Sequence, residues 1–196
     1  MSRSGMIERT GSSLLGGDLA DGLLAVWAAE GDEDAFAVLV RRHSRPLLGL
    51  AHCMLGDAQD AEEAVQDAFV SAWRRLPEYR HDAEFPTWMY RITVNRCLNL
   101  RRHRPPPLRL DAVAEPATGD AWGQPARAAE EDAETAALTC ALGELDTGQR
   151  VCWILRELQG LPYKEIAVVT QTSEQTVRGR LFRARRSLKE AMAPWR

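Results

Sequence analysis

Apolar side chains recur at spacings of three and four residues along most of the chain, which is the period of an α-helix that packs on one side. No segment shows the alternation of apolar and polar residues that is typical of a half-buried β-strand. The pattern therefore predicts an all-α protein with two small helical domains. Proline and glycine punctuation places four helices in a block at 18–103 and four more in a block at 131–193.

In the first block, Gly31 is expected to separate the first two helices and Pro46 to reset the chain. The third helix, over about 58–76, and the fourth, over about 85–103, each combine an apolar stripe with a polar face. Those polar faces carry Asp60, Glu63 and Asp67 on the third helix and Arg91, Asn95, Asn99 and Arg102 on the fourth. An acidic face of this kind is usually only a solubilising surface.

The second block ends in a short helix that opens at Pro162, a turn, and a longer arginine-rich helix that Thr172 and Ser173 can cap. This is the plan of a helix-turn-helix. Opposite its apolar stripe the longer helix presents Gln175, Arg178, Gly179, Phe182, Arg183 and Arg186. Such a face can enter a major groove, where arginine forks to guanine; the alternative is a solvated basic helix on a bundle.

Segments outside the two blocks are rich in residues that disfavour helix. Residues 104–130 contain three consecutive prolines from 105 to 107 and are expected to form a flexible linker. The Ser/Gly-rich residues 1–17 are expected to form a disordered tail without a signal pattern. Residues 111–134 hold seven acids against Arg127, a charge of −6, so the linker is acidic.

A formal net charge of −3 argues against a nucleic-acid binder, but the charge is segregated along the chain. Residues 57–67 carry −5, residues 85–110 carry +6, and residues 172–196 carry +5. Alternating acidic and basic blocks indicate several partners rather than one.

The basic helix at 85–103 also carries aromatic residues, a combination that suits unstacked single-stranded bases. Trp88 shares a stripe with Phe85 and Ile92, however, so a core position is the alternative. The polar loop at 78–84 is therefore the better candidate for base contact.

The sequence offers no chemistry for a metal site, a cofactor or catalysis. The four cysteines, at 53, 97, 140 and 152, form no CxxC pair and are expected to be buried free thiols in a reducing cytoplasm. The four histidines, at 43, 52, 81 and 103, form no HExxH pair, and no nucleophile motif occurs. The interpretation as a helical hydrolase therefore has little support. The longest apolar stretch, 47–55, is too short to span a bilayer.

Four motifs resemble a known family. Residues 60–73 (DAEEAVQDAFVSAW) resemble region 2.2 of the sigma-70 family of RNA polymerase sigma factors, and residues 85–95 (FPTWMYRITVN) resemble regions 2.3 and 2.4. Residues 145–167 and 174–185 are similar to regions 4.1 and 4.2. Order, spacing and length match the extracytoplasmic-function group (group IV), whose members have only these two domains.

The resemblance implies a bacterial transcription-initiation factor, not an enzyme, and no cofactor. In such proteins the region 2 domain binds the clamp coiled coil of the polymerase β′ subunit, here through Asp60, Glu63, Gln66 and Asp67. It also recognises and melts the −10 element, here with Tyr79, His81, Asp82, Arg91, Asn95, Arg96, Asn99 and Arg102. The region 4 domain docks on the β flap and reads the −35 element, here with Ser173, Gln175, Thr176, Arg178, Gly179, Phe182, Arg183 and Arg186.

The same resemblance implies an anti-sigma partner and a linker that runs through the active-site cleft and RNA exit channel of the polymerase. Two residues depart from the family pattern. Gln171 stands where the turn before the recognition helix usually has Gly, which predicts backbone strain, and Gly179 stands where Ser is usual. The competing interpretation is a helix-turn-helix regulator that binds duplex DNA without polymerase, which leaves the acidic helix without a role.

Overall fold

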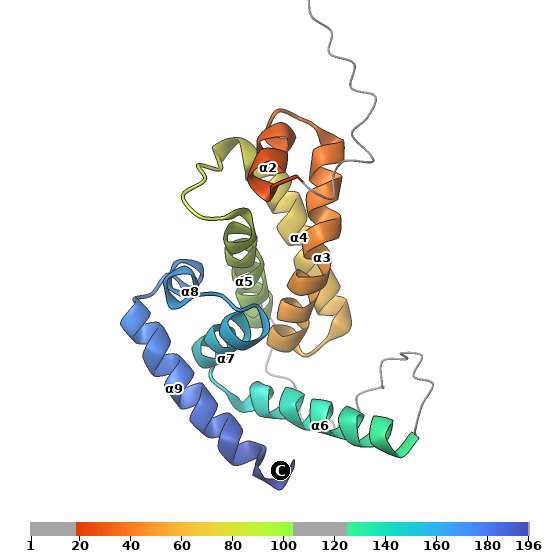
Figure 1. Ribbon diagram of the computed structural model, residues 1–196, viewed down its shortest axis with the longest axis vertical. Helices are drawn as coiled ribbons and strands as arrows, with labels where there is room; N and C mark the ends of the chain where they lie inside the picture. Colours follow the sequence, from red (N-terminus) through yellow and green to blue (C-terminus); the bar gives the residue numbers. More distant parts are fainter. Residues whose placement is uncertain (1–18, 104–124, 196) are drawn as a thin grey trace, which may run out of the picture.

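Residues 19–103 and 125–195 are described by a computed structural model, and within these two ranges the chain forms helices joined by turns and loops, with no strand. The predicted tail, the linker residues 104–124 and Arg196 lie outside the described residues. The all-α prediction is confirmed. The two helical blocks lie against each other, with α8 beside α5 (Figure 1).

The first block consists of α2 (Asp21–Ala29), α3 (Glu33–Leu55), α4 (Ala58–Arg75) and α5 (Phe85–His103), with the 3₁₀ turn η1 (Leu76–Glu78) after α4. Side chains start the helices where the sequence provides a cap: the Asp32 carboxylate accepts from the Ala35 amide at 3.1 Å, and the Asp57 carboxylate from the Asp60 amide at 2.8 Å. The helices pack as a bundle around fully buried aliphatic side chains: Leu24, Leu39, Leu47, Leu50, Met54 and Met89.

Pro46 does not reset the chain as predicted, because α3 runs through it without interruption. A proline inside a helix removes one hydrogen bond and strains the preceding turn. Leu39 before it and Leu47 and Leu50 after it are all buried on one stripe, so packing holds both halves of the helix in register. The tertiary contacts therefore override the local preference.

The second block consists of α6 (Pro125–Glu144), α7 (Thr147–Trp153) with a π-helical continuation η2 (Ile154–Leu158), α8 (Tyr163–Thr170), α9 (Glu174–Ala191) and the 3₁₀ turn η3 (Ala193–Trp195). Helix α6 begins at Pro125, inside the range predicted to be linker. Proline is favoured at the first position of a helix, and an alanine-rich stretch follows it. The linker was therefore predicted to extend too far at its C-terminal end, because Pro125 was taken as a residue that disfavours helix.

A single apolar cluster spans both blocks: Leu50 and Phe85 of the first belong to the same cluster as Ile154, Ile166 and Leu181 of the second. A smaller cluster joins α6 to α9 through Ala141, Leu142, Leu145, Ala184 and Leu188. The two blocks thus share a hydrophobic core in this conformation.

Polar contacts connect α5 to the second block. The Tyr90 hydroxyl donates to Oε1 of Gln159 at 2.8 Å, and Thr87 donates to the carboxylate of Glu165. Gln159 also donates from Nε2 to the carbonyl of Pro46 at 3.4 Å. The side chains that hold the blocks together therefore come from α5 on one side and from the η2–α8 region on the other.

Arg150 forms a further bridge from within the core, where it is only 6% exposed. Its Nη1 donates to the Met54 carbonyl at 3.1 Å, and its Nη2 donates to the carbonyls of Gly143 and Leu145. Burial lowers the pKa of Arg150. The carbonyls lie at the C-terminal ends of α3 and α6, where the helix dipole favours a cation.

The cysteines of the described ranges are all free, as predicted, but they are not all buried. Cys97 and Cys152 are buried, Cys53 is half-buried, and Cys140 is exposed. Cys140 lies on the side of α6 that faces away from Ala141 and Leu142, so the expectation of burial was wrong there. Within residues 19–103 and 125–195, no cluster of three metal-ligating side chains occurs and no helix could cross a membrane.

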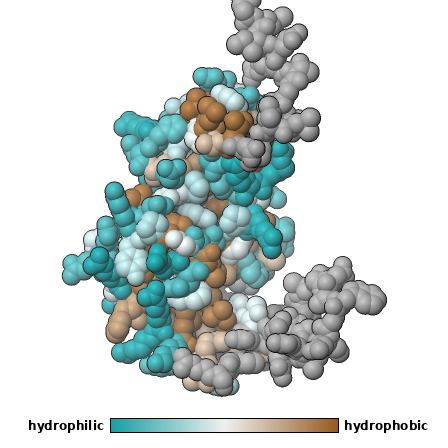
Figure 2. All heavy atoms as spheres, viewed as in Figure 1, coloured by the Kyte–Doolittle hydropathy of each residue, from teal (hydrophilic) through white to brown (hydrophobic). Residues whose placement is uncertain are grey.

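The surface in the view of Figure 2 is largely hydrophilic, and an apolar patch lies over α2, where Leu23 and Val26 are exposed.

Candidate nucleic-acid interface

Helices α8 and α9 and the turn between them form the predicted helix-turn-helix. Helix α8 ends at Gln171, whose backbone is left-handed at φ 51 and ψ 45. The turn is closed by the Thr172 amide, which donates to the Ala167 carbonyl at 3.0 Å. Ser173 caps α9 and accepts from the Thr176 amide at 3.2 Å. Gln171 has the positive φ at which strain was expected, and the turn keeps its left-handed geometry without glycine.

Helix α9 buries one stripe and exposes the opposite face. Val177, Leu181, Ala184 and Leu188 are buried against α7, α8 and α6. Of the residues predicted to contact the −35 element, Gly179 is half-buried. The others are exposed: Ser173, Gln175, Thr176, Arg178, Phe182, Arg183 and Arg186. The Phe182 side chain is 69% exposed, which is unusual for a large aromatic residue.

Gly179 lies beneath a guanidinium of this face. A Cβ at position 179 would lie 3.6 Å from Nη1 of Arg183, an ordinary van der Waals distance. The Arg183 side chain therefore folds back along the helix over Gly179.

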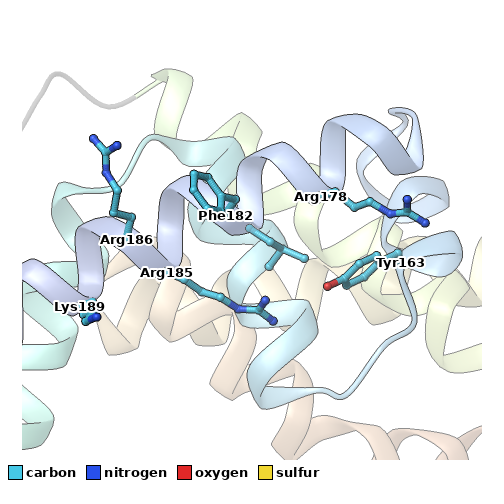
Figure 3. Close-up of a pocket in the computed structure, with 7 residues that line it drawn as sticks. Tyr163, Arg178, Phe182, Arg185, Arg186 and Lys189 are labelled. Atoms are coloured by element: carbon cyan, nitrogen blue, oxygen red, sulfur yellow. The ribbon is translucent and has the colours of Figure 1, made fainter.

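A cavity of about 330 Å³ lies along α9, beside the start of α8 (Figure 3). We call this cavity the α9 groove; it is lined by Tyr163, Arg178, Leu181, Phe182, Arg185, Arg186 and Lys189. Its lining combines aromatic and aliphatic side chains with four basic side chains.

One basic side chain of the α9 groove is tied to the protein itself. Arg185 donates from Nε and Nη2 to Oε1 of Glu157, at 3.1 and 2.7 Å. The hydrogen bond to Glu157 raises the pKa of Arg185, and an interaction with the Tyr163 hydroxyl raises it further. Arg185 therefore braces α9 against η2, a role that the sequence did not indicate because Arg185 is one of five arginines on α9.

The acidic residues predicted to bind the polymerase clamp differ in accessibility along α4. Glu63 and Gln66 are exposed, whereas Asp60, in the first turn of α4, is only 6% exposed. Asp67 is half-exposed and forms an ion pair with Arg96 of α5. This pair joins a residue predicted to contact polymerase to a residue predicted to contact the −10 element.

The remaining predicted −10 residues lie on α5 and in the loop before it. Asn95, Asn99 and Arg102 are exposed on α5, and Arg91 is half-buried. Trp88 is only 6% exposed, so the alternative that placed it in the core is correct.

The loop before α5 is organised around Tyr79. Its hydroxyl donates to the Ala83 carbonyl at 2.6 Å, and its ring lies 4.9 Å from the Trp88 ring and 4.4 Å from the His81 ring, centre to centre. Burial is the main reason that the pKa of Tyr79 is raised to about 12. His81 is left-handed at φ 58, and His81 and Asp82 are exposed. The loop thus presents an imidazole and a carboxylate to solvent on a rigid aromatic base.

Comparison with protein families finds two matches, in the order that the motifs predict. Residues 39–105 match sigma-70 region 2, and residues 135–188 match sigma-70 region 4. The chain is 38% identical to RNA polymerase sigma-H factor of Pseudomonas aeruginosa, over 84% of this chain and 89% of that protein. It is 32% identical to the extracytoplasmic-function (ECF) RNA polymerase sigma-E factor of Escherichia coli K12, over 90% of this chain and 96% of that protein.

Solved structures give the same picture. The structure of CnrH in complex with the cytosolic domain of CnrY is similar with a TM-score of 0.69 and 32% identity, over 90% of this chain and 99% of that one. The sigma factor RpoE of Bartonella quintana, solved with the anti-sigma factor NepR, shares the fold with a TM-score of 0.66 and 22% identity, over 81% of this chain and 96% of that one.

Proposed function

The chain belongs to the sigma-70 family of RNA polymerase sigma factors, in its extracytoplasmic-function group, and we propose that its two helical blocks read two separate promoter elements. As a sigma factor it binds core RNA polymerase and directs initiation at promoters. The proposal gives the −35 element to α9 and the −10 element to α5 with the Tyr79–Glu84 loop. It gives the protein no catalytic step of its own.

The observation that supports −35 reading is the exposed face of α9, where Arg178, Phe182 and Arg183 lie on one side and a buried stripe lies on the other. An α-helix with this distribution fits the major groove, where arginine donates two hydrogen bonds to guanine and an aromatic edge meets the thymine methyl. The net charge of +5 over residues 172–196 supplies attraction to the phosphates.

The observation that supports −10 reading is the exposed polar face of α5 next to the loop that holds His81 and Asp82. A base extruded from the duplex costs a few kcal/mol of lost stacking and pairing, which a preformed pocket has to offset. The loop is fixed by the Tyr79–Ala83 hydrogen bond, so it pays little ordering cost when a base binds.

The two readings require the blocks to separate. Elements at −35 and −10 are about 25 base pairs apart, which is about 85 Å along B-DNA. A compact chain of this length has a radius of gyration of about 16 Å and measures only about 40 Å across. The hydrogen bonds between α5 and the η2–α8 region must therefore open before both elements are bound.

The partners follow from this assignment. Glu63, Gln66 and Asp67 supply an accessible acidic surface for the β′ clamp coiled coil, while the second block docks on the β flap. The family resemblance leads us to expect an anti-sigma protein that holds the chain inactive, and the structural relative CnrH was solved in complex with another protein, the cytosolic domain of CnrY. A protein that works alongside the polymerase is expected in the cytoplasm.

Binding of −35 DNA tests the proposal directly. Arg178→Ala and Arg183→Ala should each cost about 1–3 kcal/mol on cognate −35 DNA and much less on scrambled DNA, because a base contact is lost with the side chain. Equal losses on both DNAs would leave only phosphate contacts. Run-off transcription with core RNA polymerase separates the proposal from a polymerase-independent regulator, which would bind duplex DNA but start no transcript.

A further inference from the structure

Tyr163, the first residue of α8, contacts arginines at two levels of the α9 groove (Figure 3). The guanidinium carbon of Arg178 lies 6.0 Å from the centre of the Tyr163 ring. Seven residues further along α9, Arg185 interacts with the Tyr163 hydroxyl. The Tyr163 side chain of α8 therefore lies beside two arginines, Arg178 and Arg185, which are two turns apart on the same side of the recognition helix.

The Tyr163 ring is itself held in place. A second guanidinium, that of Arg156, lies 5.2 Å from the ring centre, and its Nη1 donates to the Leu161 carbonyl at 2.9 Å. Arg156 is thus fixed to the backbone just before α8. The ring is half-buried and packs against the shared apolar core, so the fold itself restricts its orientation.

The two arginines of α9 differ in what else they can do. Arg185 is held by Glu157 through two hydrogen bonds, so it is directed along the surface toward η2. Arg178 is exposed and stands on the face proposed to read the −35 element. A free arginine side chain loses many rotamers when it binds a base edge, and a guanidinium already held on an aromatic ring loses fewer.

We propose that Tyr163 is a positioning residue for −35 recognition: its ring holds the Arg178 guanidinium in a restricted set of orientations, and Arg178 alone touches the base. The inference rests on the proposed function, in which Arg178 contacts DNA. It makes Tyr163 a determinant of promoter specificity although Tyr163 does not touch the bases. It also distinguishes Arg178, which reads a base, from Arg185, which braces α9 against η2.

The test uses the full chain in complex with core RNA polymerase and a promoter library randomised across the −35 element. Tyr163→Leu removes the ring, Tyr163→Met removes it while keeping an apolar side chain of similar length, and Tyr163→Phe keeps the ring without the hydroxyl. Loss of an exposed cation–π contact should weaken cognate binding about two- to fivefold in the Leu and Met variants. The Phe variant should bind like the parent.

The base pair affected identifies the mechanism. Tyr163→Leu should flatten preference at the same base pair that Arg178→Ala flattens, and it should add little when combined with Arg178→Ala. Effects that multiply in the double variant, or a uniform loss on all library members, would overturn the inference. A Tyr163→Phe variant as weak as the Leu variant would also overturn it, because the hydroxyl and Arg185 would then carry the effect.

The experiment distinguishes base reading by Arg178 from the positioning role of Tyr163. If Arg178→Ala flattens no base pair, both base reading by Arg178 and the role of Tyr163 are wrong. If Arg178→Ala flattens one base pair and both ring-less variants keep the parent preference there, only the role of Tyr163 is wrong. Thermal unfolding of each variant checks that the helix-turn-helix is still folded.

Discussion

Removing two of the hydrogen bonds that join the two blocks should shift the protein toward its open conformation and make it a better partner for the polymerase. The double variant Thr87→Val and Tyr90→Phe deletes the two hydroxyls of α5 that bond to Glu165 and Gln159 while nearly preserving side-chain volume. A hydrogen bond between neutral groups contributes about 0.5–1.5 kcal/mol and one to a carboxylate about 1.5–3 kcal/mol. The closed conformation should therefore lose about 2–4.5 kcal/mol, a shift of about 30- to 2000-fold toward the open one.

Small-angle scattering measures the opening, and run-off transcription measures its consequence. The parent should have a radius of gyration near the value of about 16 Å expected for a compact body, and the double variant a larger one. Less of the variant should be needed for half-maximal transcription, because less energy goes into separating the blocks.

Thr93→Val is the matched control. Thr93 lies on the same helix and is fully buried, and its hydroxyl has no hydrogen-bond partner within the described residues, so the substitution removes a hydroxyl without removing a contact between blocks. The control should remain as compact as the parent. The reasoning is refuted if the double variant has the same radius of gyration and the same transcription curve as Thr93→Val.

Three further predictions concern the turn, the acidic face and a buried histidine. In urea denaturation, Gln171→Gly should stabilise the fold by about 1 kcal/mol and Gly160→Ala should destabilise it by a similar amount. Both positions have a left-handed backbone, and no atom would contact a Cβ at position 160. Shifts of the same sign in the two variants would contradict this. Glu63→Lys should weaken holoenzyme formation on a native gel more than Glu62→Lys, a change of equal charge on a neighbouring side of α4; equal effects would reduce the acidic face to a general charge effect. Burial lowers the pKa of His43 below 6.5, so the folded state favours the neutral ring and the stability of the fold should fall as the pH drops below about 6.5. The loss of stability between pH 7.5 and 5.5 should be smaller in His43→Gln than in the parent. An equal loss in both proteins would exclude His43 as its source.

Helical periodicity was sufficient to predict where the helices lie, because a buried stripe repeats every three or four residues whatever it packs against. It was not sufficient where packing or a cap competes with local preference. Pro46 sits inside α3 because the stripe on either side of it is buried, and α6 starts at Pro125 because proline suits a first helical position. Both errors came from weighing proline without its surroundings.

The contacts between the blocks could not be predicted in the same way. Thr87 and Glu165 are 78 positions apart, and Tyr90 and Gln159 are 69 apart. Each of these side chains occupies an ordinary polar or aromatic position on its own helix. Periodicity indicates that a face is buried but not which element covers it, so the α5 surface that meets α8 carried no signal of its own.

Gln171 shows how a departure from the family pattern is accommodated. The residue takes the left-handed backbone that glycine would take, although a side chain disfavours it by about 1–2 kcal/mol. Four side chains around the turn are buried in the same core: Ile166 and Val169 before it, and Val177 and Leu181 after it. A turn that relaxed the backbone of Gln171 would displace all four of them. Losing even one buried aliphatic contact costs more than that strain. The strain therefore remains at Gln171, and the face of α9 that carries Arg178, Phe182 and Arg183 keeps the orientation in which we propose that it reads the major groove.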